Sequence, residues 1–256
     1  SSSSSSSISQ RFFSGLSVRA VPVISYASQC VWSSRGTMSN NDASIWVPST
    51  SVRLHRNRVR LCVGYVASGS LSPPSLQALQ QAGTRAEDSR TGQELPPSDV
   101  FPPITIELAD TTRSALSSSP ELAIAAKRLF PPPLRFEQVW SKKRGQQQLF
   151  VWTGVPPSAE FVCLGMVATT TSAPPPADCI RCVPKGWCVE AEMEPQLIWS
   201  DQGSGGKPGS FWTTSAHNLL CVEPSHASPK GRKVYQLFKQ DFLAGKAPSV
   251  AKSLQL

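Results

Sequence analysis

The 256-residue chain has 25 Lys and Arg against 17 Asp and Glu, which gives a formal net charge of +8, and 39% of its residues are hydrophobic. This composition allows a packed core, but no apolar run approaches the roughly 18 residues that a membrane-spanning helix needs. The seven cysteines are an odd number and too few for a disulfide scaffold in a chain of this length. We therefore expect free thiols in a reducing, cytosolic setting.

In chain order, the sequence divides into a Ser-rich tail (1–20), a first β-repeat (21–68), an insertion (69–134), a second β-repeat (135–183), a degenerate third β-repeat (184–229) and a basic tail (230–256). The insertion is rich in Ser, Pro, Gln and Gly, and we expect it to be mostly disordered. Short helices are predicted within it at 75–81 and 121–129. The basic tail is a further candidate for a short helix.

The spacing of the tryptophans defines the repeat. In each copy a Trp-Ser pair is followed, 12 to 14 residues later, by a second tryptophan, and only Trp187 is left over. Residues 62–67 and 163–168 then share the pattern Cys-x-Gly-x-Val-Ala. The third copy keeps Cys221 but has Glu223 where the others have glycine. We expect the repeat core to consist of Trp32, Trp46, Trp140, Trp152, Trp199, Trp212, Gly64 and Gly165.

Short apolar runs bounded by turn residues predict β-strands in each copy. A tryptophan near the end of each strand of a hairpin would form a cross-strand aromatic pair. Three such hairpins can pack their tryptophan faces together. The sequence therefore predicts an all-β domain with a threefold repeat, prism-like or propeller-like, in which the tryptophans are buried.

Three stretches together resemble a known repeat: residues 198–206 (IWSDQGSGG), 44–48 (SIWVP) and 131–141 (PPPLRFEQVWS). This is the repeat of the vacuolar protein sorting-associated protein 62 family, which also occurs in plant and protist relatives of vacuolar protein sorting-associated protein 13. The resemblance covers a little over half of the chain. It implies a non-catalytic, adaptor-binding piece of a trafficking or lipid-transfer protein, cytoplasmic and peripheral at endosomal, vacuolar or other organelle membranes.

Loops between the copies can border a groove for an extended peptide, because β-repeat surfaces bind such peptides by strand addition or by packing prolines on aromatics. The candidate binding rim consists of Arg56, Arg58, Pro156, Pro157, Gly205 and Lys207. The predicted partner is a trafficking adaptor protein that presents a Pro-containing segment. The net positive charge also permits peripheral contact with an anionic membrane.

Two other binding classes remain as alternatives. A basic nucleic-acid-binding protein would need exposed aromatic side chains interleaved with basic ones on one face. A small zinc protein would use Cys179, Cys182 and Cys188, with Cys221 or His217 as the fourth ligand. Since that fourth ligand is not clear from the spacing, we expect no metal.

A catalytic role would need a nucleophile with a base and an orienting group, and Cys163, His217 and Asp201 are the residues that offer one. However, Cys163 recurs as Cys62 inside the same apolar run of the first copy. A catalytic cysteine has no reason to be duplicated in this way. We therefore expect neither enzymatic activity nor a cofactor.

Overall fold

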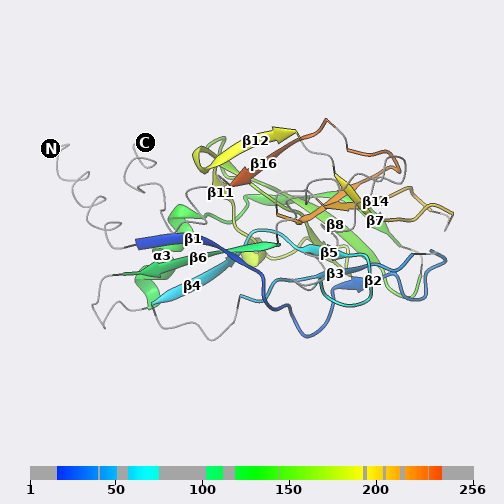
Figure 1. Ribbon diagram of the computed structural model, residues 1–256, viewed down its shortest axis with the longest axis horizontal. Coiled ribbons are helices and arrows are strands. Elements are labelled where there is room, and N and C mark those ends of the chain that lie inside the picture. The colour runs from blue at the N-terminus through cyan, green and yellow to red at the C-terminus, as the bar shows by residue number, and fades with distance from the viewer. Residues whose placement is uncertain are drawn as a thin grey trace, which may run out of the picture.

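The computed structural model describes residues 16–39, 41–50, 57–74, 102–111, 119–143, 145–192, 195–203, 206–213, 217–229 and 231–237. Within these ranges the chain folds into short antiparallel strands and one α-helix, so the all-β class predicted from the sequence is confirmed. Figure 1 shows two regions along the long axis: a group of small sheets towards one end, and a sheet with a helix behind it towards the other.

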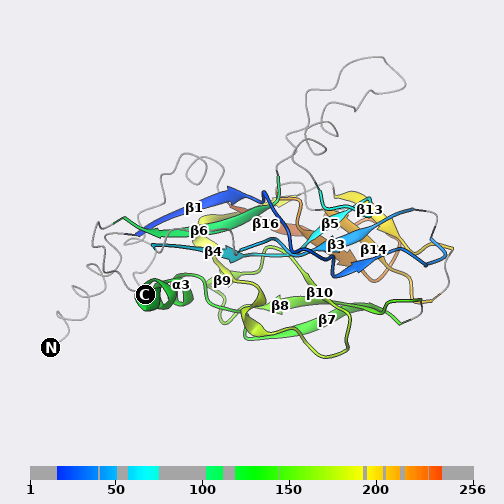
Figure 2. The ribbon, with the colours of Figure 1, turned by 90° about the horizontal axis from the view of Figure 1, so that it is seen from below.

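Three three-stranded sheets carry the repeats, and in each the strand with the second tryptophan lies in the middle. Their strands are β2 (Trp32–Ser33), β3 (Ser44–Trp46) and β5 (Val66–Ser68); β7 (Arg135–Lys142), β8 (Leu149–Val155) and β10 (Val167–Thr169); and β13 (Gln196–Ser200), β14 (Ser210–Thr213) and β15 (Leu220–Glu223). In Figure 2 the sheet of β7, β8 and β10 lies below the strands of the other two sheets.

The register of each hairpin separates its two tryptophans. Trp140 lies directly opposite Val151, the residue before Trp152. Since successive side chains of a strand point to opposite faces, Trp140 and Trp152 lie on opposite faces of their sheet. The other two hairpins have the same register. The cross-strand pairing of two tryptophans within one hairpin, predicted from the sequence, is therefore wrong.

The first tryptophans of the three repeats instead meet one another between the sheets. The ring centroid of Trp199 lies 5.4 Å from that of Trp32 and 6.4 Å from that of Trp140. Phe211 contacts all three, at centroid distances of 4.7 to 6.0 Å. None of the four side chains is more than 3% exposed. Aromatic pairs of this kind contribute about 0.5–1.5 kcal/mol beyond simple burial, so the cluster joins the three repeats into one core.

The same three indoles hold the hairpin loops in place. Each Nε1–H donates to the loop of the following repeat, and the bonds run in a cycle: Trp32 to the carbonyl of Gln147 (3.3 Å), Trp140 to the carbonyl of Lys207 (3.2 Å) and Trp199 to Oγ of Ser39 (2.8 Å). The approach is close, because a Cβ on Gly209 would lie 2.2 Å from the ring of Trp140. The described parts of the three hairpin loops therefore lie together at one end of the molecule, which we call the fixed loop end.

The second tryptophans bind hydroxyl groups on the other face of each sheet. The donor–acceptor pairs are Trp46 with Ser44 (2.7 Å), Trp212 with Ser210 (2.7 Å) and Trp152 with Thr169 (2.9 Å). In the second repeat, Phe150 occupies the position that Ser44 and Ser210 have in the other two, and Thr169 on the neighbouring strand lies directly opposite Phe150. The hydroxyl has thus moved to the neighbouring strand. All six indole N–H groups are bonded, which avoids the roughly 1–3 kcal/mol cost of a buried unpaired donor.

A closed ring of three backbone hydrogen bonds joins equivalent positions of the three repeats. The bonds are 2.8 to 3.0 Å long and run from the N–H of Tyr65 to Met166, from Met166 to Leu220, and from Leu220 to Tyr65. The residues just before the three ring members, Gly64, Gly165 and Leu219, are packed together. A Cβ on Gly165 would lie 2.9 Å from Cβ of Leu219 and 3.0 Å from Cα of Gly64. The counterpart of the two glycines in the third repeat is therefore Leu219, and the assignment of Glu223 to that position is wrong.

The second region is a three-stranded sheet of β1 (Leu16–Pro22), β6 (Ile104–Asp110) and β4 (Arg58–Cys62), in that order. β1 begins inside the predicted Ser-rich tail, and β6 lies inside the predicted disordered insertion. Those expectations are wrong at 16–20 and 104–110, because antiparallel pairing between segments more than 80 residues apart orders both strands.

The helix predicted at 121–129 is confirmed as α3 (Ser119–Leu129), whereas the one predicted at 75–81 lies outside the described residues. The apolar residues of α3 recur at helical spacing on one buried face: Leu122, Ala125, Ala126 and Leu129. This face packs against β4 and β6. Pro120 suits the first turn, and Pro131 follows closely after the end.

Two small sheets complete the fold: β9 (Phe161–Val162) with β11 (Val183–Pro184), and β12 (Cys188–Glu192) with β16 (Lys233–Leu237). In the sequence, the 3-10 helix η1 (Ala177–Cys179) lies between β9 and β11, and the 3-10 helix η2 (Lys185–Trp187) lies between β11 and β12. Trp187, the tryptophan outside the repeat pattern, is 1% exposed, and its ring centroid lies 5.5 Å from that of Phe130. The short helix expected in the basic tail is wrong at 233–237, which form a strand, and 238–256 lie outside the described residues.

His217 holds the end of β16 through a hydrogen bond. Because this histidine is buried, we predict that the stability of the protein depends on pH. Its Nε2 accepts the N–H of Leu237 at 3.2 Å, so the neutral ring carries its proton on the buried Nδ1. Burial lowers the pKa of His217 to about 4. Since the unfolded chain binds the proton more tightly, stability should fall by about 2–3 kcal/mol as pH decreases from about 6.5 to 4.

The measurement is the free energy of unfolding of wild type and His217→Gln across this pH range. Glutamine can still accept the N–H of Leu237 but does not titrate. The variant should lose the extra slope between pH 6.5 and 4. Equal slopes in the two proteins would show that His217 does not stay neutral in the folded state.

Candidate functional site

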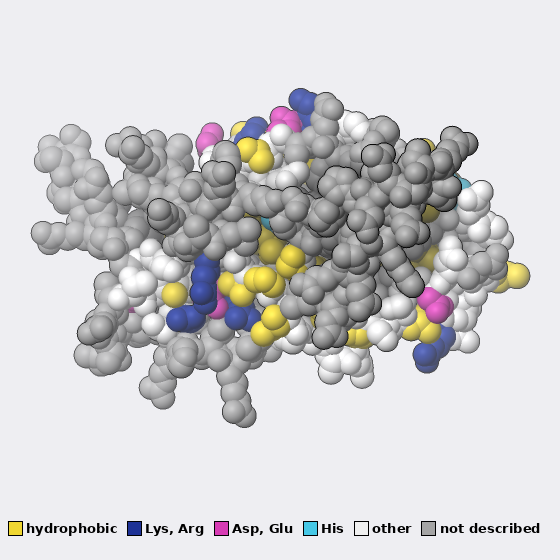
Figure 3. Space-filling model, in the orientation of Figure 1, with side chains coloured by type: hydrophobic (Ala, Val, Ile, Leu, Met, Phe, Trp, Pro, Cys, Tyr) yellow, Lys and Arg dark blue, Asp and Glu magenta, His cyan; other side chains and the backbone are white. Residues whose placement is uncertain are grey.

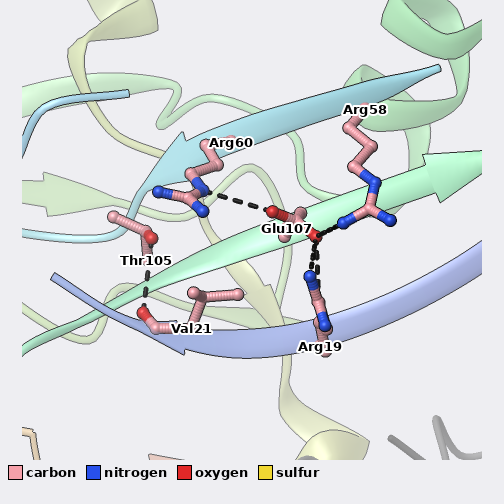
Figure 4. Close-up of polar contacts among 6 residues, drawn as sticks. All are labelled: Arg19, Val21, Arg58, Arg60, Thr105 and Glu107. Atoms are coloured by element: carbon pink, nitrogen blue, oxygen red, sulfur yellow. Dashed lines mark hydrogen bonds and ion pairs between the residues drawn. The ribbon is translucent and has the colours of Figure 1, made fainter. Parts of the chain in front are cut away.

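A row of charged side chains crosses the β1–β6–β4 sheet. Glu107 on β6 lies directly opposite Arg19 on β1 and Arg60 on β4. Its Oε1 accepts from Nε and Nη2 of Arg19, at 2.9 and 2.5 Å, and from Nη1 of Arg58 at 3.1 Å. Its Oε2 accepts from Nε of Arg60 at 3.2 Å. Figure 4 shows the three guanidinium groups converging on one carboxylate. We call these four residues the arginine face.

Strand alternation explains why these charges gather on one side. Ile106 and Leu108 flank Glu107 and point to the opposite face, where they are fully buried in the core that includes α3. Thr105 shares the face of Glu107, and its hydroxyl donates to the carbonyl of Val21 (Figure 4). The apolar side of β6 therefore fixes the sheet, and the polar side presents the arginines.

Burial and the neighbouring arginine charges shift the pKa of Glu107 in opposite directions. Its side chain is 1% exposed, against 46%, 38% and 12% for Arg19, Arg58 and Arg60. Burial raises the pKa of the carboxyl, but the hydrogen bonds and charges of the three arginines outweigh it and hold the pKa below its usual value. The resulting stabilisation is present above the ordinary pKa and is lost as pH falls through the lowered one.

The arginine face carries an excess of positive charge. Three guanidinium groups against one carboxylate leave a net charge of +2. Each guanidinium has five N–H donors in a planar fork, and Glu107 has only two oxygens, so donors remain for a further anion. Figure 3 shows basic side chains over these strands with hydrophobic ones beside them. Such a surface is suited to bidentate binding of carboxylate or phosphate groups.

The described residues of the candidate binding rim lie in different parts of the fold. Arg56 and Gly205 lie outside the described residues, and Arg58 belongs to the arginine face. Pro156 and Pro157 follow the C-terminal end of β8, whose first residue pairs with the last residue of β7. Lys207 contacts the opposite end of that hairpin through Trp140. The prolines and the lysine thus lie at opposite ends of one sheet.

The three candidate zinc ligands have different surroundings. Cys179 packs against the core formed by the repeats, whereas Cys188 packs against the core beneath α3. Cys182 is fully buried, and its sulfur lies 3.3 Å from that of Cys163. Within the part of the chain that the structure describes, no three His, Cys, Asp or Glu side chains are grouped closely enough to hold a metal ion.

The members of the candidate nucleophile set each have another partner. Cys163 contacts Cys182, and His217 accepts the backbone N–H of Leu237. Asp201 is 4% exposed and lies 2.7 Å from Nε2 of His226, while its Oδ1 also accepts the N–H of Gly209. These contacts give Asp201 a role in closing the β13–β14 hairpin loop rather than in orienting a catalytic base.

Sequence reasoning did not find Arg19, Arg60 or Glu107. A local signal was present, because Ile-Thr-Ile-Glu-Leu at 104–108 alternates as a strand does and 58–60 reads Arg-Val-Arg. The Ser- and Pro-rich composition around residues 104–108 concealed it. Glu107 binds Arg19, which is 88 positions away in the sequence, and Arg60, which is 47 positions away. Residue spacing alone does not predict such contacts.

No family model and no curated protein matches this chain. The structure is similar to the crystal structure of GNIP1Aa from Chromobacterium piscinae, with a TM-score of 0.54 and 15% sequence identity. The similarity covers 83% of this chain and 34% of that chain, so the chain spans about a third of the length of GNIP1Aa. At this identity the likeness is one of fold. No helix among the described residues is long and apolar enough to span a membrane.

Proposed function

We propose that this chain is a non-catalytic protein-binding module whose arginine face binds an acidic segment of a partner protein. The net charge of +2 around the buried carboxylate of Glu107 carries this proposal. Glu107 pre-orders the guanidinium groups, which reduces the entropy that they lose when an anion binds. Carboxylates of Asp and Glu side chains match the forked donors of arginine.

The surroundings of the aromatic side chains favour a protein partner over single-stranded nucleic acid. Stacking of bases needs exposed rings beside basic residues. All seven tryptophans are at most 8% exposed, and none of the exposed large hydrophobic side chains among the described residues is aromatic. The basic residues of the arginine face lie on β1 and β4, on either side of β6, and form a compact group rather than a track along a groove.

The resemblance to the vacuolar protein sorting-associated protein 62 repeat supports the class of partner. By that resemblance the partner is a trafficking adaptor, met in the cytoplasm at the surface of an endosomal, vacuolar or other organelle membrane. The separation of Pro156 from Lys207 removes support for a proline-binding groove between them. We therefore place the partner's acidic residues, and not its prolines, at the centre of recognition.

The test uses the full chain and a labelled poly-glutamate peptide, with a poly-glutamine peptide of the same length as the neutral probe. Poly-glutamate should bind in the micromolar range. The double variant Arg19→Gln and Arg58→Gln should weaken this binding about 10-fold or more, since each lost bond to a charged group contributes about 1.5–3 kcal/mol. Arg60 is retained, so Glu107 keeps one partner.

The matched control changes two basic residues at the fixed loop end, Arg35→Gln and Lys207→Gln. It removes the same net charge from a different surface and should leave the affinity for poly-glutamate within about twofold. An equal loss in both double variants would show that only overall charge matters. Tighter binding of a single-stranded oligonucleotide or of phosphatidylserine vesicles than of poly-glutamate, lost in the arginine variant, would replace the protein partner by that ligand.

A further inference from the structure

Two thiols from distant parts of the sequence face each other across the β9–β11 pair. Val162 pairs with Val183 and Phe161 with Pro184 in antiparallel register. Cys163 and Cys182 occupy the next pair of positions in the same register. Their sulfurs lie 3.3 Å apart, and all seven cysteines are free. Directly opposed residues in an antiparallel pair have Cα atoms about 4.5–5.5 Å apart, which lies within the range that a disulfide spans.

The two thiols differ in their access to solvent. Cys163 lines an open hollow of about 100 Å³, whose wall also includes Thr153, Cys221 and Tyr235. Cys182 is fully buried. A small molecule that reacts with thiols can therefore reach Cys163 from the hollow. Cys182 is not accessible to it and can react only with the sulfur of Cys163.

We propose that Cys163 and Cys182 form a redox-active dithiol that a low-molecular-weight disulfide, such as oxidised glutathione, converts into an intramolecular disulfide. This site is independent of the arginine face and of the function proposed for it.

Thiol–disulfide exchange accounts for every atom and electron. The Cys163 thiolate attacks one sulfur of the small disulfide, whose S–S bond breaks and releases one small thiol. The Cys182 thiolate then attacks the sulfur of Cys163, forms the protein disulfide and releases the second small thiol. The two thiol protons pass to the released thiols. The protein loses two electrons, and the small disulfide gains two.

The new bond would close a loop of chain between Cys163 and Cys182, which are 19 positions apart, and this loop includes Met166 of the backbone ring. A cross-link of this length constrains the unfolded chain more than the folded one. The midpoint of thermal unfolding should therefore rise by about 6–12 °C on oxidation. Reduction should reverse the rise.

The experiment treats the reduced full chain with oxidised glutathione, blocks the remaining thiols and maps disulfides by peptide mass spectrometry. Wild type should lose two thiols and yield one linked pair of peptides containing Cys163 and Cys182. Cys182→Ser should hold glutathione on Cys163, because no second thiol displaces it. Cys163→Ser should leave Cys182 reduced and show no rise in the thermal midpoint.

Cys221→Ser is the matched control, since Cys221 lines the same hollow and should not alter the Cys163–Cys182 link. A different cysteine pairing, retention of all seven thiols, or glutathione that stays on Cys163 in wild type would overturn the proposal. The disulfide map of wild type decides these outcomes even where a serine variant folds poorly.

Discussion

Replacing Trp199 with alanine should lower the free energy of unfolding by about 3–5 kcal/mol, the range measured for large aromatic side chains removed from a core. Trp199 is 1% exposed and contacts the rings of Trp32, Trp140 and Phe211. Its indole also donates to Ser39 in the hairpin loop of the first repeat. The substitution therefore opens a cavity where all three repeats meet and releases one loop.

Denaturant unfolding with paired variants separates this role from simple burial. Trp152 lies on the face of its sheet opposite to Trp140 and outside the aromatic cluster. Trp152→Ala should lower the free energy of unfolding by about 3 kcal/mol. Trp199→Ala combined with Trp32→Ala should deviate from additivity by about 1 kcal/mol or more, since their rings are in contact. Additive losses, or an unchanged midpoint in Trp199→Ala, would contradict a shared core between the repeats.

Gly165→Ala should destabilise the protein by about 3 kcal/mol, at the upper end of the range for overpacking. The added Cβ would lie 2.9 Å from Cβ of Leu219 and 3.0 Å from Cα of Gly64. Both neighbours belong to chain segments held by the ring of backbone hydrogen bonds, so neither can move without breaking that ring. The cost comes from packing, because the backbone of Gly165 does not have a positive φ.

Gly69→Ala is the control, because a Cβ there meets no atom within 4 Å and its stability should stay within about 0.5 kcal/mol of wild type. Adding Leu219→Ala to Gly165→Ala should cost less than the sum of the two single changes, since the smaller side chain gives the segment room to shift. Unfolding midpoints measured in denaturant check both expectations. A Gly165→Ala protein as stable as wild type would show that the three segments are not in close contact.

The repeated strands followed from local patterns, whereas their mutual arrangement did not. The Trp-Ser segments and the second tryptophans lie on strands as predicted, because short apolar runs between turn residues have few other stable conformations. The alignment of the third copy failed because the sequence offered Cys221 as a landmark. The backbone ring aligns Leu220 with Tyr65 and Met166 instead, and this correspondence exists only in three dimensions.

The sequence by itself determined the class of fold, the number of repeats and the buried character of the tryptophans, since spacing and hydrophobicity are local properties of the chain. The tertiary structure decided which face each tryptophan occupies, how the hydroxyl partner moved from the serine position to Thr169, and where the charges of the arginine face meet. The physical reason is register. One residue of shift turns a side chain to the other face of a sheet, and pairing across 88 positions is set by the packing of the whole domain.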